Sequence, residues 1–246
     1  MTPASLNGMW SIGRSDPAAE ADLPLPLEIR PVRSARRMRL RIDDQRGVIK
    51  LTCPPRTSRR TAVRWALEQR GWIDAQLAKA PPLEPFAPGA RIPFEGREIS
   101  LEVDRAAPRT GRFDGERLLV GGAESGFERR VERILRARAA QILSAEVAEF
   151  AALAGVKATA VSVGDAATRW GSCSSGGRIR FNWRLILAPP SVRRFVVAHE
   201  VAHLRHLNHG PQFRQLEAEL VGPGLARAKA DLRALGPRLR RIGRSI

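Results

Sequence analysis

Hydrophobic and polar residues alternate in the N-terminal part of the chain, which is typical of strands with one buried face. Met38, Leu40 and Ile42 alternate with arginines, and the turn sequence DDQRG joins this run to a second one, VIKLTCP. The two runs predict a β-hairpin within residues 30–54. We expect Cys53, at the end of the second run, to be a small packed residue rather than a nucleophile, because no histidine lies near it in the sequence.

Apolar residues recur at helical spacing after the predicted hairpin. Thr57 or Ser58 is expected to cap a helix that runs to about Lys79, and the proline-rich segment APPLEPFAPGA then forms a connector. Short runs with alternating apolar residues predict a small antiparallel β region at residues 91–94, 98–103 and 117–120. Apolar positions then recur at helical spacing, which predicts a long helix from about Ser125 to Leu153.

The remaining third of the chain predicts a strand, a hairpin and helices. Lys157 to Val163 is the strand, and SSGG is the turn between the β-prone runs TRWGSC and RIRFNWRL. The edge of this hairpin would either bind an extended peptide or serve as scaffold. Pro189, Pro190 and Ser191 begin a helix with two apolar faces, and two more helices follow at 212–220 and 225–235. The basic end GPRLRRIGRSI is predicted to be a flexible tail.

All four histidines of the chain lie in one stretch, HEVAHLRHLNHGPQF, which starts at His199. His199 and His203 are four residues apart, so both imidazoles face the same side of a helix and can reach one metal ion. Glu200 lies about 100° round the helix from His199. This position suits a base that takes a proton from a metal-bound water, as in zinc hydrolases with the H-E-x-x-H pattern.

A third ligand is needed, and the sequence offers His206 and His209. His206 lies roughly 10.5 Å along the helix axis from His199, too far for one ion on a straight helix. Asn208 and Gly210-Pro211 end helices, so the chain is expected to turn after about Leu207 and bring His209 back to the metal. We therefore predict Zn²⁺ bound by His199, His203 and His209, with His206 as a candidate for transition-state stabilisation.

The composition of the chain narrows the choice among other classes of protein, namely structural zinc, membrane, secreted and nucleic-acid-binding proteins. Only two cysteines are present, so a closed structural zinc site is disfavoured and a reducing, cytoplasmic location is expected. No apolar run is long enough to cross a membrane, and the first 28 residues read as a disordered leader rather than a secretory signal. The net charge of +17 indicates either contact with nucleic acid or another polyanion, or a generally basic surface from arginine-rich composition.

Three motifs resemble the YgjP-like metallopeptidases, relatives of the SprT and WLM zinc proteases. They are RWGSCSS at Arg169, FNWRLILAPP at Phe181 and VVAHEVAHLRHLNHGPQF at Val196. The resemblance implies an α+β fold, in which an N-terminal antiparallel β and helix region precedes a zincin-like metallopeptidase domain with an H-E-x-x-H active-site helix. It also implies zinc on His199, His203 and His209 and Glu200 as the catalytic acid and base. The expected domains are a leader at 1–28, a β-rich region with one helix at 29–122, a zincin-like region at 123–222 and a basic helix and tail at 223–246.

These observations favour a zinc-dependent peptidase that acts on peptide or protein substrates. Because the chain has no tyrosine, the donor to the oxyanion would be His206, Arg169 or Asn182 if a side chain serves, and the sequence does not choose among them. Arg169, Trp170 and Asn182 are the predicted substrate-binding residues. The oligomeric state is left open.

Two other functions are compatible with the same site. The first is a nucleotide pyrophosphohydrolase, because Arg169, Arg184 and Arg205 would suit a triphosphate, although the sequence shows no acidic cluster for magnesium. The second is a DNA-associated protease of the SprT type, in which the basic surface would bring the site to proteins on DNA.

Overall fold

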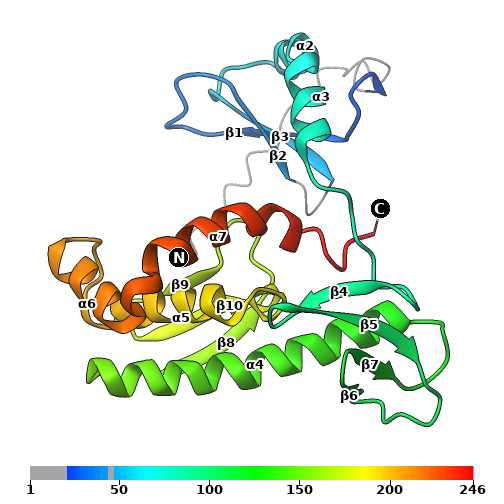
Figure 1. Ribbon diagram of the computed structural model, residues 1–246. Helices are drawn as coiled ribbons and strands as arrows, with labels where there is room; N and C mark the ends of the chain where they lie inside the picture. Colours follow the sequence, from blue (N-terminus) through cyan, green and yellow to red (C-terminus); the bar gives the residue numbers. More distant parts are fainter. Residues whose placement is uncertain (1–20, 44–46, 246) are drawn as a thin grey trace, which may run out of the picture. The chain divides into compact units, whose positions relative to one another are not determined.

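The structure, a computed structural model, describes residues 21–43 and 47–245 (Figure 1). Contacts divide the chain into two units, Met1–Ala80 and Pro81–Ile246. The predicted boundary after residue 122 does not coincide with this division, because the strands at residues 91–120 pack with the C-terminal unit. Most of the predicted leader lies outside the described residues.

The first unit is a small sheet with two helices. The strands are β1 (Leu27–Pro31), β2 (Arg39–Asp43) and β3 (Val48–Cys53). β2 and β3 are antiparallel, which confirms the predicted hairpin, while β1 adds to β3 in parallel. Most of the predicted turn DDQRG lies outside the described residues. The helical segment is interrupted at Gln69 and forms α2 (Arg59–Glu68) and α3 (Arg70–Lys79).

A hydrophobic core holds this first unit together. Ile49, Leu51 and Cys53 of β3 are fully buried and pack with residues of both helices, including Ala62 and Ile73. Cys53 is a free, packed thiol as expected, and burial raises its pKa. Ser58 caps α2 by accepting a hydrogen bond of 3.1 Å from the backbone N–H of Thr61.

The second unit begins with a four-stranded sheet in the order β4-β5-β7-β6. Its strands are β4 (Arg91–Phe94), β5 (Arg97–Val103), β6 (Arg112–Asp114) and β7 (Arg117–Val120). The predicted sheet was antiparallel throughout, but β5 and β7 run parallel. Strand β6, which alternation did not predict, pairs antiparallel with β7 and so reverses the chain before β7 begins.

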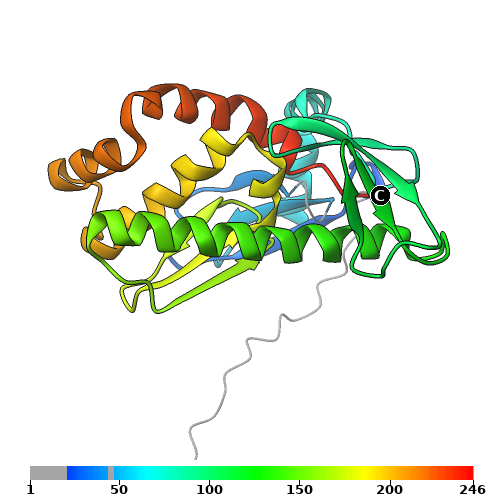
Figure 2. The ribbon, with the colours of Figure 1, turned by 60° about the horizontal axis from the view of Figure 1, so that its bottom comes forward.

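The long helix α4 (Phe127–Ala154) organises the second unit. Figure 2 shows it running from the sheet β4–β7 at one end to the neighbourhood of α6 at the other. It ends at Gly155, whose φ of 63° is in the left-handed region that glycine adopts without strain. One face of α4 is buried throughout, as its helical spacing predicts, by residues such as Val131, Leu135, Leu143 and Phe150.

A second sheet lies beside α4 and leads to the metal-binding stretch. β10 (Arg178–Asn182) lies between β8 (Ala160–Gly164), with which it is parallel, and β9 (Gly171–Cys173), with which it is antiparallel. The predicted hairpin at SSGG is thus confirmed. The 3₁₀ segment η1 (Trp183–Leu187) is fully buried and leads to α5 (Pro190–Arg205).

Helix α5 is fixed in the core by both apolar contacts and a buried ion pair. Val192, Val197 and Val201 are fully buried. Arg193 donates to Glu146 of α4 over 2.8 Å and also contacts Glu95 at 3.2 Å, so its charge is compensated inside the protein. The start and direction of α5 are therefore determined by both α4 and the first sheet of this unit.

Two further helices complete the second unit, α6 (Pro211–Val221) and α7 (Leu225–Leu239), with a short η2 (Gly222–Gly224) between them. Within the described residues, no helix is both long and apolar enough to cross a membrane.

The C-terminal residues correct one prediction, because the expected flexible tail is packed. Ile242 is fully buried, and its carbonyl accepts a hydrogen bond of 2.9 Å from Arg184. The backbone of Glu84 bonds to Arg241 and Gly243, which makes a short parallel bridge. The basic composition of the tail concealed two buried apolar side chains, Leu239 and Ile242.

Candidate metal centre

Three imidazoles meet where α5 ends and α6 begins. His199 and His203 lie one turn apart on α5. The helix stops at Arg205, His206 adopts an extended conformation, and the chain reverses before Pro211 starts α6. This turn brings the Nε2 atom of His209 to 3.3 Å from Nε2 of His199 and to 3.2 Å from Nε2 of His203.

The other ring nitrogens of two of these histidines have acceptor partners. Nδ1 of His199 lies 2.7 Å from the carboxylate of Glu217, and Nδ1 of His203 lies 3.1 Å from the backbone carbonyl of His206. These acceptors favour the tautomer with the proton on Nδ1, so each Nε2 keeps its lone pair. Lone pairs that face one another at this distance repel, and a cation between them would remove that repulsion.

The geometry fits a tetrahedral transition-metal site. Ligand atoms of the three histidines all lie within 4.8 Å of one another. Imidazole nitrogens bound at 2.0–2.1 Å to a tetrahedral zinc ion stand about 3.3 Å apart, close to the separations of 3.2 and 3.3 Å from His209. The three histidines can therefore hold one ion with little movement.

Glu217 is a buried carboxylate that links α7 to the histidines. Its side chain is 3% exposed, and its second oxygen accepts from Nζ of Lys229 on α7 at 2.7 Å. Burial alone would raise the pKa of Glu217, but the hydrogen bonds from Lys229 and His199 bring it below its usual value. The carboxylate thus stays charged and fixes the orientation of the His199 ring.

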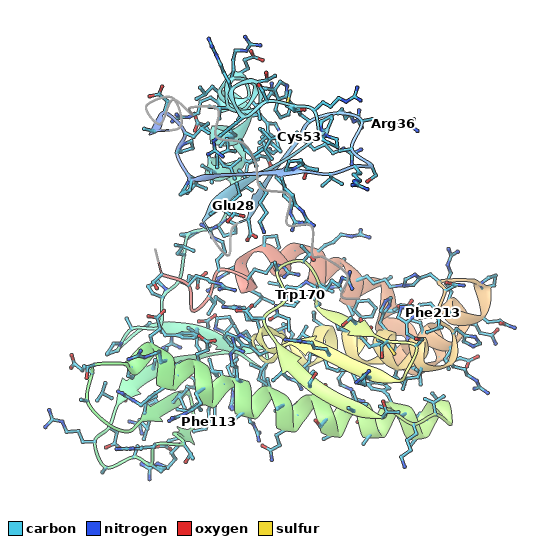
Figure 3. The ribbon with its side chains drawn as sticks, turned by 180° about the vertical axis from the view of Figure 1, so that it is seen from behind. Glu28, Arg36, Cys53, Phe113, Trp170 and Phe213 are labelled. Atoms are coloured by element: carbon cyan, nitrogen blue, oxygen red, sulfur yellow. The ribbon has the colours of Figure 1, made fainter. Side chains whose placement is uncertain are left out.

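Phe213 fills the space behind all three imidazoles. Its ring centroid lies 5.1 Å from that of His199, 4.5 Å from that of His203 and 4.7 Å from that of His209. The side chain comes from α6 and is 1% exposed (Figure 3). Packing against one rigid aromatic ring restricts the rotamers of the three histidines, so the site is preorganised.

Glu200 lies on α5 beside the first histidine and is 5% exposed. Burial raises the pKa of its carboxyl group to about 7, and the positive charge of Arg169 acts in the opposite direction. A cation held by the three histidines would also lower the pKa. Glu200 therefore has the burial and the neighbours of a group that exchanges protons near neutrality.

Gly171 on β9 provides the space for this carboxylate. A Cβ atom at residue 171 would contact Oε1 of Glu200 and lie 2.6 Å from its Cγ and 2.7 Å from its Cδ. Real side chains do not approach so closely, so a larger residue at this position would displace Glu200. The glycine of the RWGSCSS motif is thus required by the position of the glutamate.

A cavity of about 310 Å³ opens next to Glu200 and His199. Its walls come from β9 and the residues before it, from α5 and from α7, and include Arg169, Trp170, Phe195, Val196 and Leu232. Trp170 packs against α7, where the guanidinium of Arg240 lies 4.2 Å from the ring centroid (Figure 3). The cavity is therefore mostly apolar, with charged groups at Glu200 and Arg169.

The structure brings most of the predicted site residues together, gives His206 a supporting contact and places Asn182 elsewhere. His199, Glu200, Arg169 and Trp170 all line the cavity. The carbonyl of His206 supports His203. Asn182 is buried, donates to the carbonyl of Ala166 at 3.1 Å and accepts from the N–H of Arg184 at 2.9 Å, so its amide caps η1.

Three supporting residues were not assigned a role from the sequence, namely Gly171, Phe213 and Glu217. Gly171 lies within the RWGSCSS motif, and Phe213 ends the histidine stretch. Their positions in these motifs were the one feature of the sequence that could have indicated a role in the site. Glu217 lies eighteen residues after His199 on a different helix. No periodicity connects those two positions, because their contact depends on how α6 packs against α5.

An α+β chain that gathers three imidazole nitrogens beside a buried glutamate has the ligands and the base of a metal-dependent hydrolase. Comparison with protein families identifies the particular class, since the model described as "YgjP-like, metallopeptidase domain" matches residues 36–235. The chain therefore belongs to the YgjP-like metallopeptidase family.

A solved structure, the metallopeptidase zymogen of Pyrococcus abyssi abylysin, is similar at 21% identity with a TM-score of 0.35. The similarity covers 41% of this chain and 97% of that chain. Comparison with curated proteins gave no match.

Proposed function

We propose that this protein is a zinc-dependent peptidase in which Glu200 moves protons during hydrolysis of a peptide bond. The observation that carries the proposal is the convergence of three imidazole Nε2 atoms next to Glu200 and the cavity. His199, His203 and His209 would hold the ion. Three neutral nitrogen ligands, which leave a fourth position open, are typical of catalytic zinc.

Bound zinc would polarise the scissile carbonyl and lower the pKa of a coordinated water to about 7. Glu200 would accept a proton as water attacks the carbonyl and then donate it to the leaving amine. Its burial next to the cavity suits both transfers, because a buried carboxyl group holds a proton more readily than an exposed one. Proton transfer of this kind typically contributes about 10² to 10⁴ to the rate.

Arg169 is the side chain best placed to stabilise the oxyanion. It lines the cavity, and its charge acts on Glu200. Asn182 uses its amide in buried hydrogen bonds, and the part of His206 that contacts the site is its carbonyl. A guanidinium donor would take the role that many zinc peptidases give to tyrosine, which this chain lacks.

The edge of β9 offers a binding place for an extended peptide. β9 is the last strand in the order β8-β10-β9, so its outer edge has no partner strand among the described residues. Gly171 at its start lies against Glu200 and lines the cavity. A substrate strand paired with this edge would therefore place its backbone beside the proton donor, with a side chain directed to the apolar walls.

The cavity favours peptide over nucleoside triphosphate. Of the three arginines considered for phosphate binding, Arg169 lines it, whereas Arg184 is 1% exposed and bonded to Asp165 at 2.6 Å. Arg205 donates to the carbonyl of Ala154 at 3.3 Å. One cation beside apolar walls suits the backbone carbonyl and side chain of a peptide better than several phosphate groups.

The proposal is tested with zinc-loaded protein and the Glu200→Gln variant. A mixed peptide library and nucleoside triphosphates are offered separately, with new amines and released pyrophosphate as the two measured products. We expect peptide cleavage by the parent protein, loss of about 10² or more in rate for the variant, and an unchanged zinc content. Equal cleavage by both proteins, or pyrophosphate release without peptide cleavage, would contradict the proposal.

A further inference from the structure

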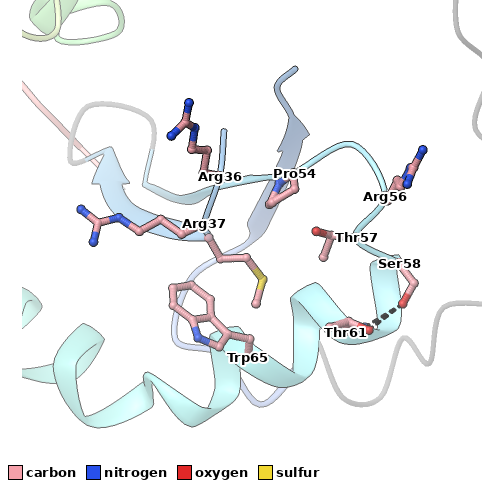
Figure 4. Close-up of a pocket in the computed structure, with 9 residues that line it drawn as sticks. Arg36, Arg37, Pro54, Arg56, Thr57, Ser58, Thr61 and Trp65 are labelled. Atoms are coloured by element: carbon pink, nitrogen blue, oxygen red, sulfur yellow. Dashed lines mark hydrogen bonds between the residues drawn. The ribbon is translucent and has the colours of Figure 1, made fainter. Parts of the chain in front are cut away.

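The N-terminal unit contains a second cavity, of about 700 Å³, at the start of α2 (Figure 4). Three arginines, Arg36, Arg37 and Arg56, contribute to its lining. They come from two separate segments, one before β2 and one between β3 and α2. No acidic residue is part of the lining among the described residues.

These three arginines are exposed and have no ion-pair partner within the part of the chain that the structure describes. Some arginines of the nearby helices do have such a partner. Arg70, for example, is paired with Asp74 at 2.8 Å. Three guanidinium groups without an acidic partner in the described chain line one cavity, so a ligand with negative charge would be stabilised there.

A large share of the positive charge of the chain lies in the segment that includes the residues of this cavity. Residues 29–65 contain twelve arginines and lysines but two acidic residues, so this segment carries more than half of the net charge of +17. A general bias of composition would distribute the charge along the chain. The concentration therefore points to a local polyanion site.

The floor of the cavity is not charged. Met38 and the half-buried indole of Trp65 form an apolar surface, and both pack against the core of this unit. Figure 4 shows Trp65 on the side of Arg36 and Arg37, and Thr57, Ser58 and Thr61 on the side of Arg56. The hydroxyl groups of Ser58 and Thr61 are hydrogen-bonded to each other at 2.8 Å, so the cap of α2 has its partners within the protein. The three arginines are the cationic side chains of the lining.

We propose that this cavity binds single-stranded nucleic acid, with Arg36, Arg37 and Arg56 on consecutive phosphates and a base stacked on Trp65. A nucleic-acid strand carries a flat ring next to every phosphate, which matches a cavity lined by one indole and three arginines. A phosphorylated peptide would satisfy the arginines but leave the indole without a partner.

The proposal is independent of the peptidase chemistry, and its test is a binding measurement. A fluorescein-labelled single-stranded oligonucleotide of mixed sequence is titrated with the full-length protein, and anisotropy is recorded at several salt concentrations. The triple variant Arg36→Ala, Arg37→Ala, Arg56→Ala is expected to bind at least tenfold more weakly. Its salt slope should be smaller by about 2, because each phosphate contact contributes about 0.7 for single strands.

A matched control removes the same charge from exposed arginines of the other unit. The triple variant Arg97→Ala, Arg105→Ala, Arg109→Ala has the same net charge and should bind nearly as well as the parent. Trp65→Leu should weaken binding about fivefold or more, and Trp65→Phe should restore most of it, since stacking needs an aromatic face. Thermal unfolding of each variant establishes that the first unit is folded.

Equal weakening by the two triple variants would mean that total charge, not this cavity, attracts the strand, and would overturn the proposal. So would Trp65→Leu protein that is folded and binds like the parent. A phosphorylated peptide of equal charge that displaces the oligonucleotide at the same concentration would also contradict it, because the indole would then have no role.

Discussion

His199 and Glu217 form a hydrogen-bonded pair, with Nδ1 of the histidine 2.7 Å from a carboxylate oxygen of the glutamate. The carboxylate is buried and its other oxygen is held by Lys229, so neither partner can rotate freely. An imidazole held in this way directs its Nε2 atom toward the Nε2 atom of His209, where the three histidines meet. Carboxylates in this position orient histidine ligands and increase their basicity.

Glu217→Gln is therefore expected to lower the affinity for zinc by about 10- to 100-fold. The amide keeps the size of the side chain but loses the charge that holds the proton on Nδ1 of His199 and that pairs with Lys229. Competition with a chelator of known zinc affinity measures the change.

Glu219→Gln is the matched control, because Glu219 is exposed on the same helix and bonds to Gln215. Its affinity for zinc should equal that of the parent. An unchanged affinity in Glu217→Gln would show that the carboxylate does not position His199.

Much of the candidate site was predictable because it depends on local geometry. The spacing of His199 and His203 follows from the helical period, and Asn208 with Gly210 and Pro211 correctly indicated the turn that returns His209. Glu217 was not predictable in this way, since its contact with His199 arises only when α6 packs on α5. The same limit applies to β5 and β7, whose parallel pairing depends on the path of the chain between them.

Gly171→Ala should reduce kcat/KM by about 10²-fold while leaving the zinc content unchanged. The added methyl group would overlap the side chain of Glu200 and move its carboxylate away from the cavity. Gly176→Ala is the control, because the nearest atom to its added Cβ is Oγ of Ser174 at 3.9 Å. Peptide cleavage and metal analysis are compared for the two variants, and a Gly171→Ala protein as active as the control would refute the steric argument.

Asp165→Asn tests an ion pair of the core through its dependence on pH. Burial alone would raise the pKa of Asp165, but Arg184, Arg244 and Arg136 together hold it below the usual value. The folded-state pKa is thus lower than the unfolded one, so the pair stabilises the protein fully above the ordinary aspartate pKa of about 3.9. This contribution is lost as the pH falls through the folded-state pKa.

At neutral pH, Asp165→Asn should lower the free energy of unfolding by about 3 kcal/mol, because Arg184 stays buried without its charged partner. The difference from the parent should shrink below about pH 4. Urea unfolding at several pH values measures it. Asp231→Asn removes a surface pair with Arg227 and should cost less than about 1 kcal/mol at every pH. A cost for Asp165→Asn that does not change with pH would contradict the assignment.

Ile242→Ala tests whether the C-terminal residues are part of the core. Ile242 is fully buried, and its neighbours include the side chain of Arg184 and the backbone of Glu84. Truncation of a buried isoleucine leaves a cavity and should lower the free energy of unfolding by about 2 to 5 kcal/mol. Leu153→Ala removes an aliphatic side chain of the same size that is 67% exposed, so it should cost well under 1 kcal/mol. If both variants unfold at the parent's urea midpoint, the C-terminal residues do not stabilise the fold in solution.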